Sequence, residues 1–143
     1  MLAHPVFDQL KELRCHGMIE ALQEQLKQPD IQQLSFDERF ALLIERECIT
    51  RENRRLTTRL RQAKLKISAC LEDIDYQASR GLSKTVINQL APSLWISRKQ
   101  NLLITGPTGK GKTYLACAFA NQACREGVSA RYLRLPRLFQ AVE

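Results

Sequence analysis

The sequence lacks the patterns that mark secreted, metal-binding and membrane-spanning proteins. Its five cysteines are odd in number and no two are spaced as C-x-x-C, so neither a disulfide framework nor a zinc site is predicted. No stretch approaches 18 consecutive apolar residues, and the N-terminus has no charged segment followed by a long apolar run. Reduced, mostly buried cysteines are typical of cytosolic proteins, so we expect a cytoplasmic protein that makes no membrane contact.

Acidic residues are the scarcer charged type. The chain has 22 Lys and Arg against 15 Asp and Glu, a net charge of +7. The segment from Arg46 to Lys66 holds eight basic and two acidic residues, so it carries most of this excess. Arg51, Arg55 and Arg59 share a helix face, which suits a DNA phosphate backbone, although a solvated face that keeps the protein soluble has the same pattern. The predicted DNA contacts are Arg51, Arg54, Arg55, Arg59 and Arg61.

Apolar spacing predicts a helical N-terminal half. Helices are expected over 5–14 and 18–27, with Gly17 as the stop of the first. The segment Ser35-Phe36-Asp37-Glu38 has the capping-box pattern S-x-x-E and predicts a long helix over 36–66. We therefore expect a helical domain over 1–66 that contacts DNA or a partner protein, followed by a linker over 67–100 with one short helix at 84–90.

One segment matches the phosphate-binding pattern G-x-x-x-x-G-K-[ST] at every position. Residues 101–105 before it predict a buried strand and 113–126 after it predict a helix, which is the context in which such a loop binds phosphates. Its glycines allow backbone N–H groups to point inward, and the helix adds the positive end of its dipole. The predicted nucleotide-binding residues are Gly106, Pro107, Thr108, Gly109, Lys110, Gly111, Lys112 and Thr113.

The two residues that end the motif have distinct chemical roles. Lys112 is expected to reach the β- and γ-phosphates, and the Thr113 hydroxyl is expected to bind Mg²⁺, so ATP and Mg²⁺ are the predicted cofactors. Downstream, a second strand is predicted over 130–135 and a helix from 137. The only acidic residues after Thr113 are Glu126 and Glu143, and neither follows an apolar strand. We therefore expect the chain alone not to hydrolyse ATP at a useful rate.

These motifs resemble the IstB-like transposition helper ATPases, which are relatives of the DnaC helicase loaders in the AAA+ class. The stretch from the glycine loop to Phe139 is the most specific part of the resemblance. The segments that carry it are 17–22, 71–75, 81–82, 101–113, 115–118, 122–127 and 134–139.

The resemblance implies an α/β protein: a helical domain, then the first two strands and the nucleotide loop of a truncated P-loop (AAA+) parallel-sheet domain over 101–143. It also implies an ATP-binding helper of DNA transposition that works with DNA and a partner transposase and forms a homo-oligomer. Two alternatives remain open at this point. One is a helicase loader, and the other is a DNA-binding or interaction module without nucleotide activity.

Overall fold

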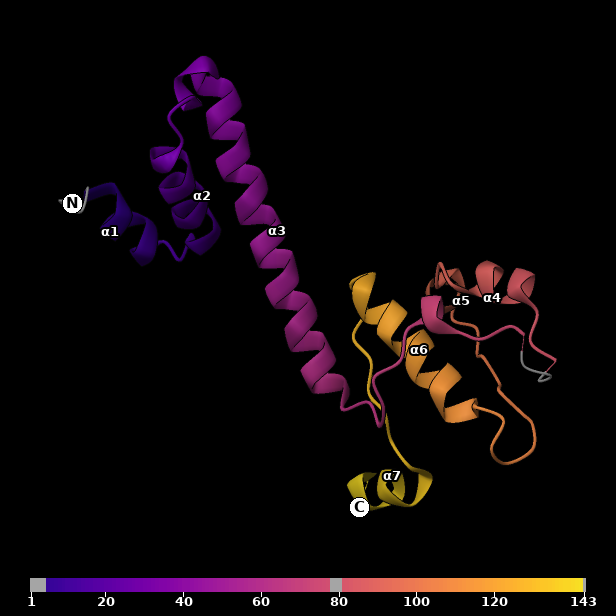
Figure 1. Ribbon diagram of the computed structural model, residues 1–143. Coiled ribbons are helices and arrows are strands. Elements are labelled where there is room, and N and C mark those ends of the chain that lie inside the picture. Colours follow the sequence, from indigo (N-terminus) through magenta and orange to yellow (C-terminus); the bar gives the residue numbers. More distant parts are fainter. Residues whose placement is uncertain (1–4, 78–80, 143) are drawn as a thin grey trace. The chain divides into compact units, whose positions relative to one another are not determined.

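The computed structural model describes residues 5–77 and 81–142, in which every regular element is a helix (Figure 1). The chain divides into two compact units, Met1–Arg55 and Leu56–Glu143, called here the N-terminal and C-terminal units. Helix α3 contributes residues to both. The elements in chain order are α1 (Pro5–Glu12), α2 (His16–Lys27), η1 (Ile31–Gln33), α3 (Phe36–Ala63), η2 (Leu71–Asp73), α4 (Lys84–Leu90), α5 (Leu94–Ser97), α6 (Lys112–Arg125) and α7 (Leu135–Val142).

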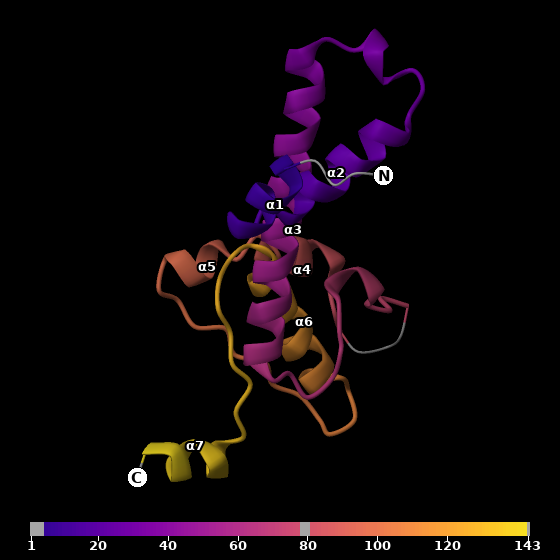
Figure 2. The same cartoon turned by 90° about the vertical axis from the view of Figure 1, so that its left-hand side faces the viewer.

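Helix α2 lies beside α3 in the N-terminal unit (Figure 2), and Gly17 stands where the two helices approach. A Cβ atom on Gly17 would lie 2.8 Å from the carbonyl oxygen of Arg46 and 2.8 Å from the Cα of Glu47. Both are backbone atoms of α3, so they cannot move aside as the end of a side chain can. The prediction that Gly17 ends the first helix is wrong, because Gly17 is the second residue of α2. It is needed there for the close approach of two helices.

The buried carboxylate of Glu47 accepts a hydrogen bond from the N-terminal turn of α2. Cys15, the N-cap residue of α2, makes no side-chain cap hydrogen bond. Instead, the backbone N–H of Met18 donates to Glu47 Oε2 at 3.0 Å, and Arg51 Nε donates to Glu47 Oε1 at 2.8 Å. Burial raises the pKa of Glu47, but the hydrogen bonds from Arg51 and Met18 outweigh it and hold the pKa below its usual 4.5. This one side chain therefore joins α3 to the N-terminus of α2.

The predicted capping box at the start of α3 is confirmed. The backbone N–H of Glu38 donates to Ser35 Oγ at 3.2 Å, and the backbone N–H of Ser35 donates to Glu38 Oε2 at 2.8 Å. The helix ends at Ala63 rather than at the predicted residue 66. Lys64 has a φ of 50°, in the left-handed region that commonly follows a helix C-terminus.

One face of α6 lies buried in the C-terminal unit. Cys117 and Ala118 have no solvent exposure, because they face segments that precede the glycine loop in the sequence. Residues 67–100 supply half of the buried cluster, including η2 and α4. The buried cluster consists of Ala69, Leu71, Ile74, Ile87, Leu115, Cys117, Ala118 and Phe119.

The predicted α/β class, with its parallel sheet, is wrong for the described residues. Residues 101–105 and 130–134 have no regular secondary structure, and no strand occurs in 5–77 or 81–142. A strand requires a neighbour whose N–H and C=O groups pair with its own in a ladder, and apolar residues alone do not supply one. The backbone N–H of Tyr132 donates instead to the carbonyl oxygen of Ala63 at 2.8 Å, and Leu103 is 86% exposed.

Helix α7 begins inside the segment predicted as the second strand. It starts at Leu135, and Pro136 is its second residue. Proline is well suited to the first turn of a helix, because its missing N–H would have had no partner there. Pro136 therefore belongs to the start of a helix and does not end a strand.

Replacing Gly17 by Ala is expected to destabilise the N-terminal unit by about 1–3 kcal/mol, because the added methyl group forces α2 away from α3. Helix propensity alone has the opposite sign and favours Ala over Gly by up to about 1 kcal/mol. Thermal unfolding followed by circular dichroism measures the difference, with Gln23→Ala on the exposed side of α2 as the control. An unchanged or raised melting temperature in Gly17→Ala would contradict the close approach.

The lowered pKa of Glu47 predicts a specific acid sensitivity. A carboxylate with a lowered pKa stabilises the fold above its unfolded pKa, here 4.5, and this stabilisation is lost as the pH falls through the folded pKa. Between about pH 6 and about pH 3.5, the wild-type melting temperature should therefore fall further than that of Glu47→Gln. Equal falls in the two proteins would show that Glu47 does not contribute to acid unfolding.

Candidate nucleotide-binding site

The glycine loop precedes α6 and has the backbone conformation that its glycines permit. Gly109 has a φ of 82° and Gly111 a φ of 87°, both in the left-handed region. For a residue with a Cβ atom, this left-handed conformation costs about 1–2 kcal/mol of free energy. Gly111 is also the N-cap of α6, so the chain turns directly from the loop into the helix.

Lys112 and Thr113 are the first two residues of α6. Lys112 Nζ donates a hydrogen bond to the carbonyl oxygen of Gly106, so this side chain lies across the loop. Thr113 is exposed on the same first turn. The first N–H groups of a helix have no intrahelical partners and form the positive end of its dipole. An anion held by the loop would therefore meet backbone N–H groups, the Lys112 ammonium and the Thr113 hydroxyl.

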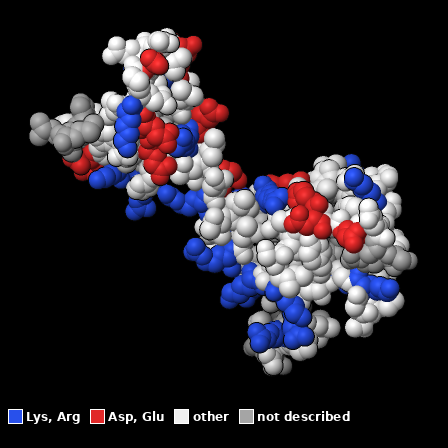
Figure 3. All heavy atoms as spheres, in the orientation of Figure 1, with Lys and Arg blue, Asp and Glu red and all other residues white. Residues whose placement is uncertain are grey.

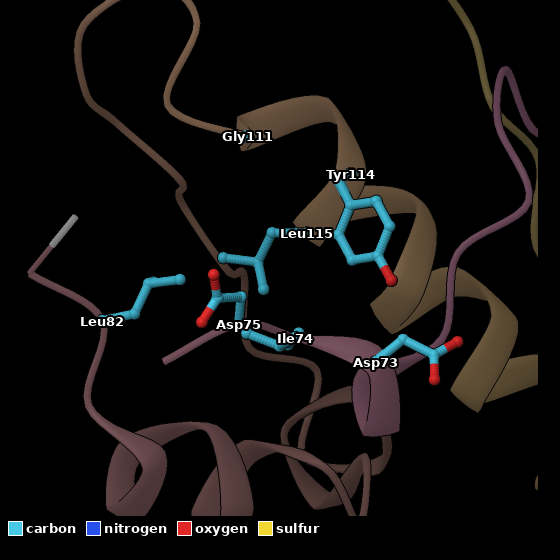
Figure 4. A pocket seen from close by; sticks show the side chains of 7 residues that line it. All are labelled: Asp73, Ile74, Asp75, Leu82, Gly111, Tyr114 and Leu115. Atoms are coloured by element: carbon cyan, nitrogen blue, oxygen red, sulfur yellow. The ribbon is translucent and has the colours of Figure 1, made fainter. Parts of the chain in front are cut away.

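Two neighbouring hollows lie at this end of α6. The first, of about 310 Å³, is lined by the loop itself together with Leu82, Ile104 and Leu115. The second, of about 280 Å³, is shown in Figure 4 and shares Leu82, Gly111 and Leu115 with the first. The residues that line the second hollow are Asp73, Ile74, Asp75, Leu82, Gly111, Tyr114 and Leu115.

Contacts between α6 and η2 fix the second hollow. The Tyr114 hydroxyl donates to the backbone carbonyl of Cys70 at 3.2 Å, and Arg125 pairs with Glu72 at 2.9 Å. The Arg125–Glu72 pair is solvent-exposed and contributes little by itself, so the buried face of α6 supplies most of the attachment. The segment after η2 is thereby held beside the first turn of α6.

Sequence reasoning missed the residues of the second hollow that lie before the loop. Asp73, Asp75 and Leu82 belong to segments that carry the family resemblance, but no role was assigned to them. Neither residue type nor spacing marks them as functional in the sequence. Only the packing of η2 on α6 brings them beside Gly111 and Leu115.

The five arginines predicted to contact DNA have different surroundings. Arg51 bonds to Glu47, and its guanidinium also lies 3.7 Å from the sulfur of Cys15. Arg59 donates from Nε to the carbonyl oxygen of Cys124 at 2.9 Å, near the end of α6. Arg55 lies 4.0 Å from a Glu52 oxygen. The remaining two are Arg54 and Arg61, whose side chains are exposed. DNA contact by these five stays a prediction.

Positive charge is concentrated in the C-terminal unit. The N-terminal unit has 8 Lys and Arg and 10 Asp and Glu, whereas the C-terminal unit has 14 and 5. The bond from Tyr132 to Ala63 brings Arg131 close to the end of α3, where Arg61 and Lys64 are exposed. Figure 3 shows Lys and Arg side chains gathered over the end of α3 and over α7. Arg61, Lys64 and Arg131 are called here the basic surface.

Neither a metal cluster nor a membrane helix occurs in the part of the chain that the structure describes. No group of three or more His, Cys, Asp or Glu residues in 5–77 and 81–142 could hold a metal ion. In the same ranges, no helix is both long and apolar enough to cross a membrane.

Residues 8–143 match the model of a protein family described as IstB-like ATP binding protein. The chain belongs to this family. It is 50% identical to the insertion sequence IS1162 putative ATP-binding protein of Pseudomonas fluorescens, over 98% of this chain and 61% of that protein. It is 45% identical to the putative insertion sequence ATP-binding protein y4pL of Sinorhizobium fredii, over 97% of this chain and 57% of that protein.

A more distant relative has the same kind of name. The chain is 33% identical to the putative ATP-binding protein Rv3427c in an insertion sequence of Mycobacterium tuberculosis, over 90% of this chain and 51% of that protein. The chain thus spans about half to three-fifths of the length of these IstB-like relatives. The family expected from the motifs is confirmed.

Proposed function

We propose that this chain binds ATP with Mg²⁺ at the glycine loop and serves the transposition of an insertion sequence. The observation that carries the proposal is the loop itself: left-handed glycines at 109 and 111 lead directly into the free N-terminus of α6. The relatives named above are insertion-sequence proteins whose names describe putative ATP binding. The geometry of the loop supplies the phosphate site that such a function requires.

Binding requires a small rearrangement of Lys112. Its ammonium bonds to the Gly106 carbonyl oxygen within the loop. A β- or γ-phosphate is a stronger partner for an ammonium than a neutral carbonyl is, because the phosphate carries the opposite charge. Lys112 would therefore give up its bond to Gly106 and bond to the phosphates of ATP, and the backbone N–H groups of the first turn of α6 would complete the phosphate site.

Thr113 fits the role of the Mg²⁺ ligand. Its hydroxyl is exposed on the first turn of α6, beside the residues that hold the phosphates. Mg²⁺ prefers oxygen ligands and keeps several waters when it bridges a protein and a nucleotide. A bound Mg²⁺ would neutralise part of the phosphate charge. Thr113 carries a side-chain hydroxyl directly after the motif lysine, Lys112.

DNA is the second proposed ligand. The C-terminal unit has 14 basic and 5 acidic residues, and the basic surface is exposed on it. Clustered Lys and Arg side chains bind the DNA backbone through release of counterions, without reading sequence. We also propose that the chain works with a partner transposase and associates with copies of itself. The support for this is the family resemblance and the relatives that belong to insertion sequences.

The relatives also bear on the alternatives. The helicase-loader alternative is less favoured, since the named relatives are insertion-sequence proteins. An interaction module without nucleotide activity is the alternative from a different class. It is distinguished by titration of the purified chain with labelled ATP and with duplex DNA. Binding of DNA without binding of ATP favours the interaction module.

Lys112→Ala and Gly111→Val are each expected to weaken ATP binding by at least about tenfold. The first removes a charge-assisted bond to phosphate, and the second forces a β-branched residue into a left-handed conformation. Titration with a fluorescent ATP analogue in the presence of Mg²⁺ measures the effect. Lys84→Ala removes the same charge at an exposed position outside both hollows and serves as the control. Equal ATP affinity in all four proteins would place the nucleotide elsewhere.

Replacing Arg61, Lys64 and Arg131 by Gln is expected to weaken DNA binding and to flatten its salt dependence. Each lost phosphate contact lowers the slope of log affinity against log salt by about 0.9. The matched control replaces Lys84, Arg98 and Lys99, which are exposed residues of the same unit. An Arg54→Gln/Arg55→Gln variant tests the contacts predicted from the sequence. If the control variant flattens the salt slope as much as the basic-surface variant does, DNA binding does not depend on the basic surface in particular.

A further inference from the structure

One side of α7 is apolar and exposed. Its large apolar side chains follow Leu135 after three, four and seven positions, so they lie on the same side of the helix. None of the residues Leu135–Val142 is buried, and Phe139 is 63% exposed. In Figures 1 and 2, α7 lies apart from α5 and α6 of its own chain, so these helices do not cover it. The residues of this side, called here the α7 face, are Leu135, Leu138, Phe139 and Val142.

A third hollow, of about 270 Å³, lies on α6 and has a mostly apolar lining. The lining comes from α5, α6 and residues 102, 104 and 128–130, and it shares only Ile104 with the hollow of the glycine loop. The indole N–H of Trp95 donates to the carbonyl oxygen of Leu90 at 3.1 Å, so its one polar atom is already bonded. This hollow is called here the α6 groove. Its larger lining residues are Trp95, Ile96, Leu102, Ile104, Phe119 and Val128.

The α7 face and the α6 groove match each other in shape and chemistry. An amphipathic helix binds an apolar groove through residues at positions i, i+3, i+4 and i+7, which is the spacing of the α7 face. Phe139 lies near the middle of this face, and aromatic side chains at the centre of a contact contribute most of its energy. Helix and groove both belong to the C-terminal unit, so every copy of the chain carries one of each.

The connection to α7 disfavours docking of the helix in the groove of its own chain. The backbone N–H of Tyr132 donates to the carbonyl oxygen of Ala63, which holds this connection at the end of α3. Only residues 133 and 134 separate that point from the start of α7. To reach its own groove, the chain would have to reverse within these two residues or give up the bond.

The contact area indicates how two copies would meet. An eight-residue helix is about 12 Å long and about 10 Å wide, so its docking buries about 500 Å², counted on helix and groove together. One such contact is too small for a specific association, whereas two reciprocal contacts bury about 1,000 Å², the lower limit for a specific interface. The area therefore favours a two-fold pair in which each copy supplies one helix and one groove.

We infer that two copies of this chain associate by exchanging α7, with the α7 face of each copy docked in the α6 groove of the other. The inference deepens the proposed self-association by naming its surface, and it does not depend on ATP binding. Burial of apolar side chains on both partners drives the association. An interface of this size predicts a weak dimer that dissociates on dilution.

Sedimentation velocity of the intact chain without nucleotide tests the inference. The wild-type chain is expected to shift from monomer to dimer between about 1 and about 100 μM, as befits a small interface. Phe139→Glu changes the helix, and Ala116→Glu changes an exposed residue on α6 that lines the groove. Each variant should weaken the dimer by at least about tenfold, because docking would bury an unpaired carboxylate. Both positions are exposed, so unchanged circular dichroism is expected.

Leu103→Glu is the matched control. It introduces the same charge at a strongly exposed apolar residue of the C-terminal unit that lies outside both the α7 face and the α6 groove. It is expected to dimerise as the wild type does. If the wild type dimerises but either Phe139→Glu or Ala116→Glu dimerises equally well, or if Leu103→Glu weakens the dimer as much, the inference is wrong while the proposed self-association stands. A wild-type chain that stays monomeric throughout would overturn both.

Discussion

Burial of one face of α6 is the packing on which both hollows depend. Cys117 and Ala118 are fully buried against the segments from 69 to 87, so the helix cannot shift without opening the core of the C-terminal unit. The glycine loop leads into the free end of this helix, and η2 is held along its side. The glycine loop and an apolar hollow therefore adjoin each other because both are attached to one buried helix.

The two units have different surface chemistry. Acidic residues slightly exceed basic ones in the N-terminal unit, where Gly17 and Glu47 hold α2 against α3. The C-terminal unit holds both the glycine loop and the excess of positive charge. Nucleotide phosphates and a DNA backbone are both polyanions, so one strongly basic unit is suited to both ligands. The N-terminal unit, with 8 basic and 10 acidic residues, lacks this excess of positive charge.

Local signals in the sequence predicted local structure well. The bonds between Ser35 and Glu38 and the left-handed loop glycines follow from residue type and spacing alone. Features that need a distant partner were not predictable. The apolar run at 101–105 gave no information on whether another chain segment pairs with it. Likewise, nothing in the pattern of arginines marked Arg59 as a donor to the carbonyl of Cys124, or Asp75 as a neighbour of the loop.

The central claim is that the glycine loop at the N-terminus of α6 binds the phosphates of ATP. Hydrogen exchange of the intact chain, measured with and without ATP and Mg²⁺, tests it most directly. The account predicts slower exchange on ATP binding at 106–115, with no change in α2. Exchange that is unaltered at the loop would contradict the claim.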